Sequence, residues 1–307
     1  MKEETFHFSI GPVQGFVAQA RRTRDLWAGS YLLSYLTGVG MKSVKDAGGE
    51  ITLPKIDGDP LFLALNGAVP KNHDDIAARV GSLPNRFEGS VAEPEKILKD
   101  AAVQVEQAWK KIADEVLKKL EEKATVDNDT RLIWKRQVNG FWEVAWVIGG
   151  DGSALDQRKN FRTYCINDEP GEKCTICGER QALSAGNNDG AATIKEWWRK
   201  VANTFNGERG YHFLPDGKER LCAVCFIKRV FPLVSKEAIG WDVYKNYPST
   251  AYMSAVDWLK TMLENATKNV NTAEALEKFI NEAESLDVAF DEIFSNITSV
   301  SKLLGAN

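Results

Sequence analysis

Two C-x-x-C pairs constrain the fold of this chain of 307 residues more than any other feature. The first pair is Cys174 and Cys177, and the second is Cys222 and Cys225. Four thiolates arranged in two such pairs are the ligand set of a tetrahedral structural zinc site, so we expect both segments to meet at one point. The gap of about 45 residues between the pairs predicts an inserted segment. Packing without metal, and a redox or catalytic role, are the alternatives.

Cysteine usage and charge restrict the cellular setting. The fifth cysteine, Cys165, precedes the first pair and is interpreted as a buried free thiol rather than a ligand. Paired cysteines with metal-ligand spacing favour a reducing compartment. No apolar run approaches the roughly 20 residues of a membrane span, and the N-terminus has no signal-peptide pattern. We therefore expect a cytoplasmic protein without a membrane partner, whose net charge of −4 leaves any RNA contact to a local basic patch.

Residues 1–165 are predicted to form an α+β domain. Residues 5–10 alternate apolar and polar side chains as a half-buried strand does, and Gly11-Pro12 then makes a tight exit. A helix is expected next, because apolar residues recur at helical spacing at Phe16, Ala20, Trp27, Tyr31 and Tyr35. Further strands are predicted at 50–54, 61–65 and 141–148, and helices at 76–80 and 94–123. This order is that of a ferredoxin-like, or palm, domain.

The rest of the chain is predicted to form two further domains. Residues 166–230 contain both cysteine pairs and are interpreted as a zinc-binding module, with a Gly/Asn-rich insertion at 185–190 and a helix around 194–204. Residues 231–307 are predicted to be a helical domain, since apolar residues recur every three or four positions in the segments 248–263, 272–283 and 285–304.

The N-terminal sequence IGPVQGFVAQARRTRDLWAGSYLLSYL, residues 10–36, closely resembles the start of the first palm-like domain in the large subunit of type III-B CRISPR–Cas (Cmr) RNA-targeting complexes. Further matches to this family follow in the same order at residues 82–87, 170–180, 221–229 and 247–251. The resemblance covers about residues 4–255. It implies a palm domain, a zinc module and part of the helical region that follows.

The resemblance also implies a nucleotide site. The first helix carries several arginines together with Trp27 and Gly29, which by themselves indicate either a solvated basic face or a phosphate-binding face. In relatives this segment lines a nucleotide pocket that two palm domains share. The resemblance therefore implies six nucleotide-binding candidates: Gly11, Gln14, Arg24, Asp25, Ser30 and Tyr31.

Two motifs suggest catalysis but lack the required partners. Residues Gly149-Gly150-Asp151-Gly152 resemble the Gly-Gly-Asp-Asp turn of the family's polymerase-like palm, yet the second acid is a glycine and the strand at 5–10 offers no carboxylate. We interpret them as a glycine turn. His73-Asp74 matches the dipeptide of HD nucleases, but the chain has only three histidines, His7, His73 and His212. No catalytic residue is therefore expected.

Two smaller motifs remain open. Lys228 and Arg229, which follow the second cysteine pair, are interpreted as a solvated surface pair, with contact to an RNA backbone as the alternative. Residues 247–250 are predicted to begin a helix with Ser249 or Thr250 as the N-cap. Contact with a nucleotide or a partner is the alternative for this segment.

Taken together, the chain is expected to be a noncatalytic half of a type III-B effector large subunit. The resemblance implies other Cmr subunits, crRNA and target RNA as partners. It also implies a separate chain with the second (GGDD) palm, which would complete an ATP site and supply the magnesium-binding acids. The alternatives are a stand-alone cyclase or polymerase that makes cyclic oligoadenylate, and a zinc-dependent nucleic-acid-binding adapter.

Overall fold

A computed structural model describes residues 3–70, 77–160, 168–184, 190–206, 213–214, 216–244 and 250–285. The chain divides into two compact units. The larger comprises residues 1–21 and 25–244, and the smaller comprises residues 22–24 and 245–307.

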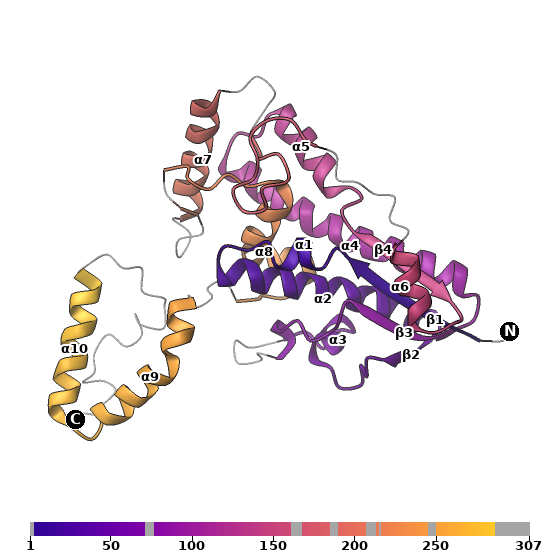
Figure 1. The fold of residues 1–307 in the computed structure, drawn as a ribbon, viewed down its shortest axis with the longest axis horizontal. Helices are drawn as coiled ribbons and strands as arrows, with labels where there is room; N and C mark the ends of the chain where they lie inside the picture. Colours follow the sequence, from indigo (N-terminus) through magenta and orange to yellow (C-terminus); the bar gives the residue numbers. More distant parts are fainter. Residues whose placement is uncertain are drawn as a thin grey trace. The chain divides into compact units, whose positions relative to one another are not determined.

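The larger unit is built on a four-stranded antiparallel sheet (Figure 1). Its strands are β1 (Glu4–Gly11), β2 (Glu50–Leu53), β3 (Arg86–Val91) and β4 (Glu143–Ile148). They lie in the order β2-β3-β1-β4, so the first strand is central and the last is at an edge. The structure is therefore of the expected mixed α+β class.

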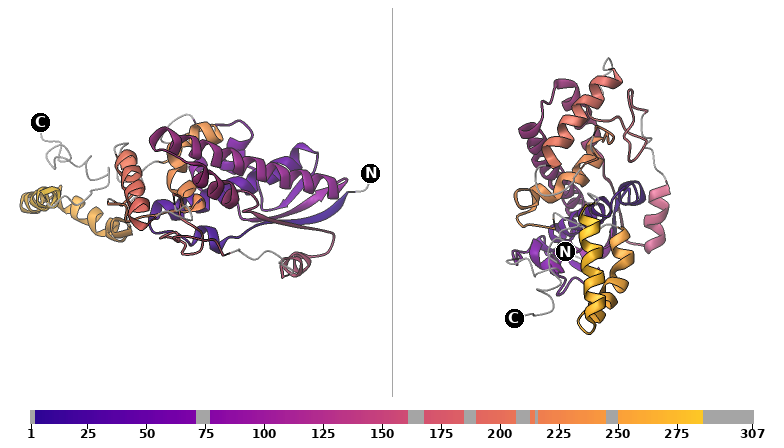
Figure 2. Two further views of the ribbon diagram at one scale, coloured as in Figure 1. Left: turned by 90° about the horizontal axis from the view of Figure 1, so that it is seen from above. Right: turned by 90° about the vertical axis from the view of Figure 1, so that its left-hand side faces the viewer.

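Long helices cover the apolar face of this sheet. Phe6, Phe8 and Ile10 of β1 are fully buried, but His7 and Ser9 between them are buried as well, so the expectation of a half-buried strand is wrong. Two helices supply much of the covering layer, α2 (Thr23–Asp46) and α4 (Pro94–Lys123), and Gly40 of α2 lies close enough to Phe8 and Phe87 that its Cβ would be in contact. A shorter helix, α6 (Gly152–Asn160), lies on the opposite side of the sheet from α4 (Figure 2).

The expected strand at 61–65 and the single long first helix are both wrong. Residues Pro60–Leu65 form helix α3, because Asp59 caps its N-terminus by accepting a 2.8 Å hydrogen bond from the Phe62 amide. The first helix is instead two, with α1 (Gln14–Val17) separated from α2. Helix η1 (Ala77–Arg79) is a short 3-10 turn within the helix predicted at 76–80.

The remaining predicted elements of this unit agree with the structure, and several helices were not foreseen. Helix α4 has the predicted bounds, β4 lies within 141–148, and α7 (Ala191–Asn206) contains the helix predicted at 194–204. Strand β3 and helices α5 (Asn128–Val138), α6 and α8 (Ala223–Ile239) were not predicted. Helix α8 continues through residue 230, where the sequence predicted the boundary between the zinc-binding module and the helical domain. The domain boundaries stay predictions.

One hydrophobic core connects the sheet to the cysteine segments. It includes residues from β1, α2 and α4 together with Cys174, Trp198 and Phe226. Phe226 of α8 contacts aromatic rings from three directions, with centroid distances of 6.2 Å to Trp134, 6.0 Å to Trp198 and 5.8 Å to Phe205. The cysteine segments are therefore packed as part of the larger unit.

Within residues 250–285, the smaller unit forms a pair of helices, α9 (Thr250–Ala266) and α10 (Val270–Ser285). Leu263 packs against a small core formed by Ala266, Ala273 and Leu276. These helices agree with those predicted at 248–263 and 272–283. In the part of the chain that the structure describes, no helix is long and apolar enough to cross a membrane.

Candidate metal centre and the buried network around it

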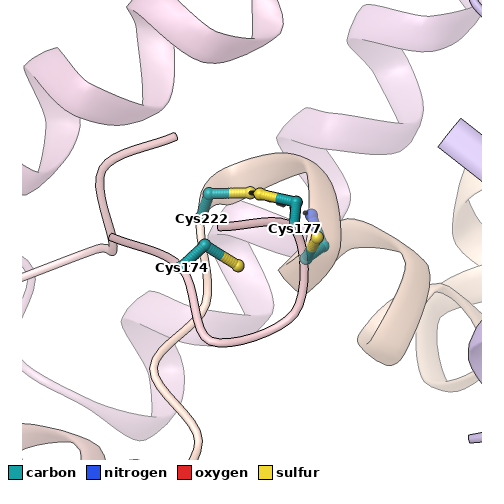
Figure 3. Close-up of side chains that lie close together, drawn as sticks. Cys174, Cys177 and Cys222 are labelled. Atoms are coloured by element: carbon teal, nitrogen blue, oxygen red, sulfur yellow. Dashed lines mark hydrogen bonds between the residues drawn. The ribbon is translucent and has the colours of Figure 1, made fainter. Parts of the chain in front are cut away.

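The four paired cysteines converge as their spacing predicts. The Sγ atoms of Cys174, Cys177, Cys222 and Cys225 all lie within 4.8 Å of one another (Figure 3). The Sγ atoms of Cys177 and Cys222 are 3.8 Å apart, which is about the edge of a tetrahedron with metal–sulfur bonds of roughly 2.3 Å. The cluster could therefore hold a metal ion such as zinc.

The first pair sits in a tight turn that points both sulfurs to the same side. The Gly178 amide donates to the Cys174 carbonyl at 2.9 Å, and the Cys174 amide donates to the Arg180 carbonyl at 2.8 Å. Gly178 has a φ of +69°, a conformation that a residue with a side chain rarely adopts. A glycine here closes the turn without strain.

The second pair is built into the start of helix α8. Cys222 is the N-cap of this helix, and its sulfur accepts a hydrogen bond from the Cys225 amide at 3.5 Å. Because the N-terminal turn of a helix carries unpaired amide groups and partial positive charge, it stabilises thiolate sulfur. The helix therefore supplies both the spacing and part of the charge compensation for this pair.

Backbone hydrogen bonds hold the two pairs in register with each other. The Thr175 amide donates to the Arg220 carbonyl, and the Leu183 amide donates to the Leu221 carbonyl, both at 2.8 Å. The Arg220 amide in turn donates to Thr175 Oγ1 at 3.1 Å. These bonds fix the distance between two segments that are far apart in sequence.

A buried glutamine on α5 supports both cysteine segments, and sequence reasoning missed it. The Gln137 side chain accepts a hydrogen bond from the Ala223 amide at 2.8 Å and donates to the Gln181 carbonyl at 2.8 Å. It also donates to Glu169 Oε2 at 2.6 Å. No local pattern marks Gln137, because its partners lie 44 and 86 residues away.

The protonation of the sulfurs is uneven without a cation. Hydrogen bonds from Cys174, and then from Cys222 and Cys225, hold the pKa of Cys177 well below its usual range. Burial raises the pKa of Cys222 well above that range. Against an opposing effect of Cys177, hydrogen bonds from Cys222 and Cys225 also lower the pKa of Cys174. The protein alone thus favours thiolates in the first pair, whereas a divalent ion would compensate the charge of all four sulfurs and so fits this donor set.

We expect Gln137→Met to weaken metal binding by about 10- to 100-fold, as loss of groups that position ligands does in other sites. Methionine keeps the volume of the side chain but makes none of the hydrogen bonds to residues 169, 181 and 223. Competition with a chromophoric chelator measures the affinity. The same substitution at the exposed Gln104 of α4 is the matched control and should leave the affinity unchanged.

Lys228 and Arg229 are buried, so the expected surface pair is wrong. Lys228 Nζ donates to the Phe16 carbonyl at 2.6 Å and to the Gln19 carbonyl. It also lies 5.1 Å from the centre of the Phe16 ring. Helix α8 is enclosed on nearly all sides, and its cations therefore find partners inside the protein rather than in solvent.

Arg229 forms a fully buried triad with two carboxylates. Its Nε and Nη2 donate to Asp25 at 2.5 and 2.7 Å, while Nη1 and Nη2 donate to Glu219 at 2.9 and 3.1 Å. Burial by itself would raise the pKa of Asp25, but attraction to Arg229 and its hydrogen bonds lower it. The same charges raise the pKa of Arg229 against the opposite effect of its burial. Asp25 and Arg229 are therefore both ionised.

Lys228 and Arg229 link the cysteine centre to the corner where β1 leads into α1 and α2. The cations lie three and four residues after Cys225, in the first turns of the same helix. Their partners are carbonyls at the end of α1 and a carboxylate at the start of α2. The geometry of the metal centre therefore bears directly on the segment that contains the nucleotide-binding candidates.

Two of these candidates are used inside the protein. Asp25 is 1% exposed and bound to Arg229. Tyr31 is fully buried, where its hydroxyl donates to the Ala78 carbonyl at 3.2 Å and accepts from Trp241 Nε1 at 2.8 Å. Both side chains therefore support the corner in this conformation.

Of the other four candidates, Gln14 and Ser30 are exposed, whereas Gly11 and Arg24 are buried. Gly11 ends β1, and Arg24 lies in the first turn of α2. Whether any of the six binds a nucleotide stays a prediction.

The Gly149-Gly150 turn is confirmed, with φ values of +70° and +72°. Asp151 Oδ1 accepts hydrogen bonds from the Ser153 amide at 2.9 Å and from Ser153 Oγ at 2.5 Å, which begins α6. These bonds hold the pKa of Asp151 below its usual range. Within the described ranges, the cysteine cluster is the one group of three or more metal-ligating side chains, and Asp151 belongs to none.

Several predicted features lie outside the described residues. They are Cys165, His73, Asp74, His212, the insertion at 185–189, residues 247–249 at the predicted helix start, and the helix at 285–304 beyond its first residue.

Comparison with known proteins confirms the resemblance found in the sequence. Residues 5–114 match the family model described as CRISPR-associated protein Cmr2, N-terminal. A solved structure described as the apo state of type III-B Cmr-beta matches with a TM-score of 0.55 and 15% identity over 87% of this chain. Another, described as type III-B Cmr-beta bound to cognate target RNA, matches with a TM-score of 0.49 and 14% identity over 86% of it.

The match to the apo structure shows a shared fold. The chain spans 37% of the length of each matched chain. No curated protein sequence matches it.

Proposed function

We propose that this chain is a noncatalytic part of a type III-B CRISPR effector large subunit. In this role it scaffolds the RNA-guided complex together with other Cmr subunits, crRNA and target RNA. The observation that carries the proposal is the family match over residues 5–114, which covers strands β1, β2 and β3, helix α2 and most of helix α4. The strand order β2-β3-β1-β4 with antiparallel neighbours supports the assignment of this part as a ferredoxin-like palm domain.

The cysteine cluster is, in this proposal, a structural zinc site. Four sulfur ligands fill a tetrahedral shell, whereas catalytic zinc sites keep one position for water or substrate. Three of the four cysteines are buried, which suits a closed site. The ion would connect the segment 174–177 to helix α8 and so stabilise the fold around it.

The corner of β1, α1 and α2 would form one side of an ATP site that a second palm domain on another chain completes. Gln14 and Ser30 are the accessible polar candidates. Asp25 and Tyr31 would act by holding the corner in place. Gly11 and Arg24 are the two remaining nucleotide-binding candidates. The partner palm would supply the acids that bind magnesium.

Purification of the tagged chain from its native host tests the scaffold role. We expect other type III-B subunits and crRNA to copurify with it, together with a chain that carries a Gly-Gly-Asp-Asp palm. Mass spectrometry identifies the proteins, and sequencing identifies the RNA. Recovery of the chain without any CRISPR subunit or RNA would contradict the proposal.

The noncatalytic role has a separate test. The isolated chain incubated with ATP and Mg²⁺ or Mn²⁺ should form no cyclic or linear oligoadenylate, because Asp151 belongs to no group of three or more metal-ligating side chains among the described residues. Liquid chromatography with mass spectrometry detects the products. Synthesis by the isolated chain, lost on Asp151→Asn, would instead show a stand-alone cyclase.

A further inference from the structure

Strand β4 is a free sheet edge within the described part of the chain. The strand order leaves β1 as its single neighbour. The Gly149 amide donates to the Thr5 carbonyl, and the Ile10 amide donates to the Asn85 carbonyl beyond β3. Odd-numbered residues of β1 therefore bond toward β4 and even-numbered ones toward β3.

This pattern determines which groups of β4 point outward. Ala145 and Val147 lie opposite Ser9 and His7 of β1, so their backbone groups bond to β1. The amides and carbonyls of Val144, Trp146 and Ile148 consequently point toward the open edge. An extended chain can pair with such a row of groups.

The two edges of the sheet differ in how they are protected. Strand β2 has four residues and a register irregularity between Ile51 and Leu53, and Pro54 follows it directly. Short length, bulges and proline are the devices that prevent unwanted pairing. Strand β4 has six residues, a regular register and one charged residue, Glu143. The β4 edge is thus competent for pairing and the β2 edge is not.

An aromatic pocket lies beside the β4 edge, between this strand and α4. Its volume is about 260 Å³, somewhat less than the roughly 300–1,000 Å³ of small-molecule sites. This size suits one large side chain. Val144 and Trp146 contribute both edge backbone groups and pocket walls, which are completed by Lys99, Ala102, Val103, Glu106, Trp109, Gly140, Phe141 and Trp142.

We propose that β4 binds an extended segment of a partner protein, which adds to the sheet as a further strand and inserts one aromatic or large aliphatic side chain into this pocket. Main-chain hydrogen bonds to Val144, Trp146 and Ile148 provide affinity. The pocket provides specificity, as alternate side chains do in other strand-addition complexes.

Two other occupants fit less well. A second copy would present its own β4, but its Val144 and Trp146 already line their own pocket, so symmetric pairing would leave both pockets unfilled. The charged residues that line the pocket are Lys99 and Glu106, of opposite sign. Nucleic acid is disfavoured because its phosphates require clustered cations.

The test screens a displayed library of random 12-residue peptides for binding to the purified full-length chain. The selected peptides are then synthesised, and their binding is measured by fluorescence polarisation. Selected peptides should carry one bulky apolar residue in an alternating sequence. The amides of the peptide are then N-methylated either at its odd-numbered or at its even-numbered positions. One of these two modifications should weaken binding at least about tenfold and the other should change it little, because only every second amide of the peptide pairs with β4. This readout uses the unaltered protein.

Two variants locate the binding site. Val144→Pro removes an outward amide but none of the bonds to β1, and Ala102→Trp fills the pocket. Each should weaken peptide binding at least tenfold. Leu132→Trp, which places the same side chain on an exposed position of α5, should have no effect. The melting temperature of each variant checks that it is folded.

Three outcomes would overturn the proposal. The first is a selected peptide whose binding tolerates N-methylation at both the odd-numbered and the even-numbered positions. The second is binding that is retained by both Val144→Pro and Ala102→Trp. The third is the absence of any selected peptide. A dimer that Val144→Pro dissociates would identify a second copy as the occupant instead. None of these outcomes bears on copurification with Cmr subunits, so the scaffold proposal is tested separately.

Discussion

Cys222→Ser is expected to abolish metal binding and to unfold the cysteine segments of the larger unit. Serine is among the best N-cap residues, so the start of helix α8 is preserved while one of four sulfur ligands is lost. Structural zinc contributes on the order of 10 kcal/mol or more of apparent binding free energy in small domains. Loss of even about 4 kcal/mol would lower the melting temperature by roughly 10 °C.

The measurement combines metal content by mass spectrometry with thermal unfolding followed by circular dichroism. The wild-type chain should contain bound zinc, and a strong chelator should reproduce the effect of the variant. Cys165→Ser is the matched control, because this cysteine is expected to be a free thiol, and should retain both the metal and the melting temperature. Full metal content in Cys222→Ser would contradict a four-sulfur site.

Features with short-range causes were predictable from the sequence. Helix α4 has its predicted bounds because Pro94 suits the first turn and an apolar stripe then continues for 30 residues. The cluster of four cysteines was predictable because a C-x-x-C pair places two sulfurs on one turn wherever it occurs. Two such pairs needed only to be brought together, which the common core does.

Short elements were harder to identify. The apolar run 61–65 is compatible with a strand or a helix, and Asp59-Pro60 before it was the feature that distinguishes the two. Strand β3 contains Gly89 and alternates weakly, so its pattern is faint. Gly89 is required because a Cβ there would lie 1.9 Å from the Glu50 carbonyl oxygen of the neighbouring strand.

Long-range charge pairing could not be predicted at all. Arg229 was interpreted as a surface residue because the sequence gives no sign of its partners. Asp25 lies 204 residues away from it, and Glu219 lies in the segment before α8. Only the folded chain shows that these three side chains meet. The same holds for Gln137, whose role depends on contacts with both cysteine segments.

Arg229→Met is expected to destabilise the larger unit by about 3–5 kcal/mol, because it leaves the buried carboxylates of Asp25 and Glu219 without their counter-charge. Denaturation by urea measures the free energy of unfolding. The triple variant Asp25→Leu/Glu219→Leu/Arg229→Met should recover much of this loss, since no unpaired charge remains buried. Recovery should be incomplete, because the Leu214 amide loses the 2.7 Å bond that it donates to Glu219.

The triad variant also tests the link between the metal centre and the nucleotide corner. Arg229→Met keeps all four cysteines, so the metal content should persist. Amide hydrogen exchange should increase in α1 and in α2 from Asp25 onward, because the contacts of these segments with α8 are weakened. Arg199→Met removes an exposed ion pair with Glu196 and should change neither property measurably. Faster exchange confined to α8 would show that the triad stabilises this helix alone. Faster exchange across the corner would show that Arg229 anchors the segment proposed to bind ATP to helix α8.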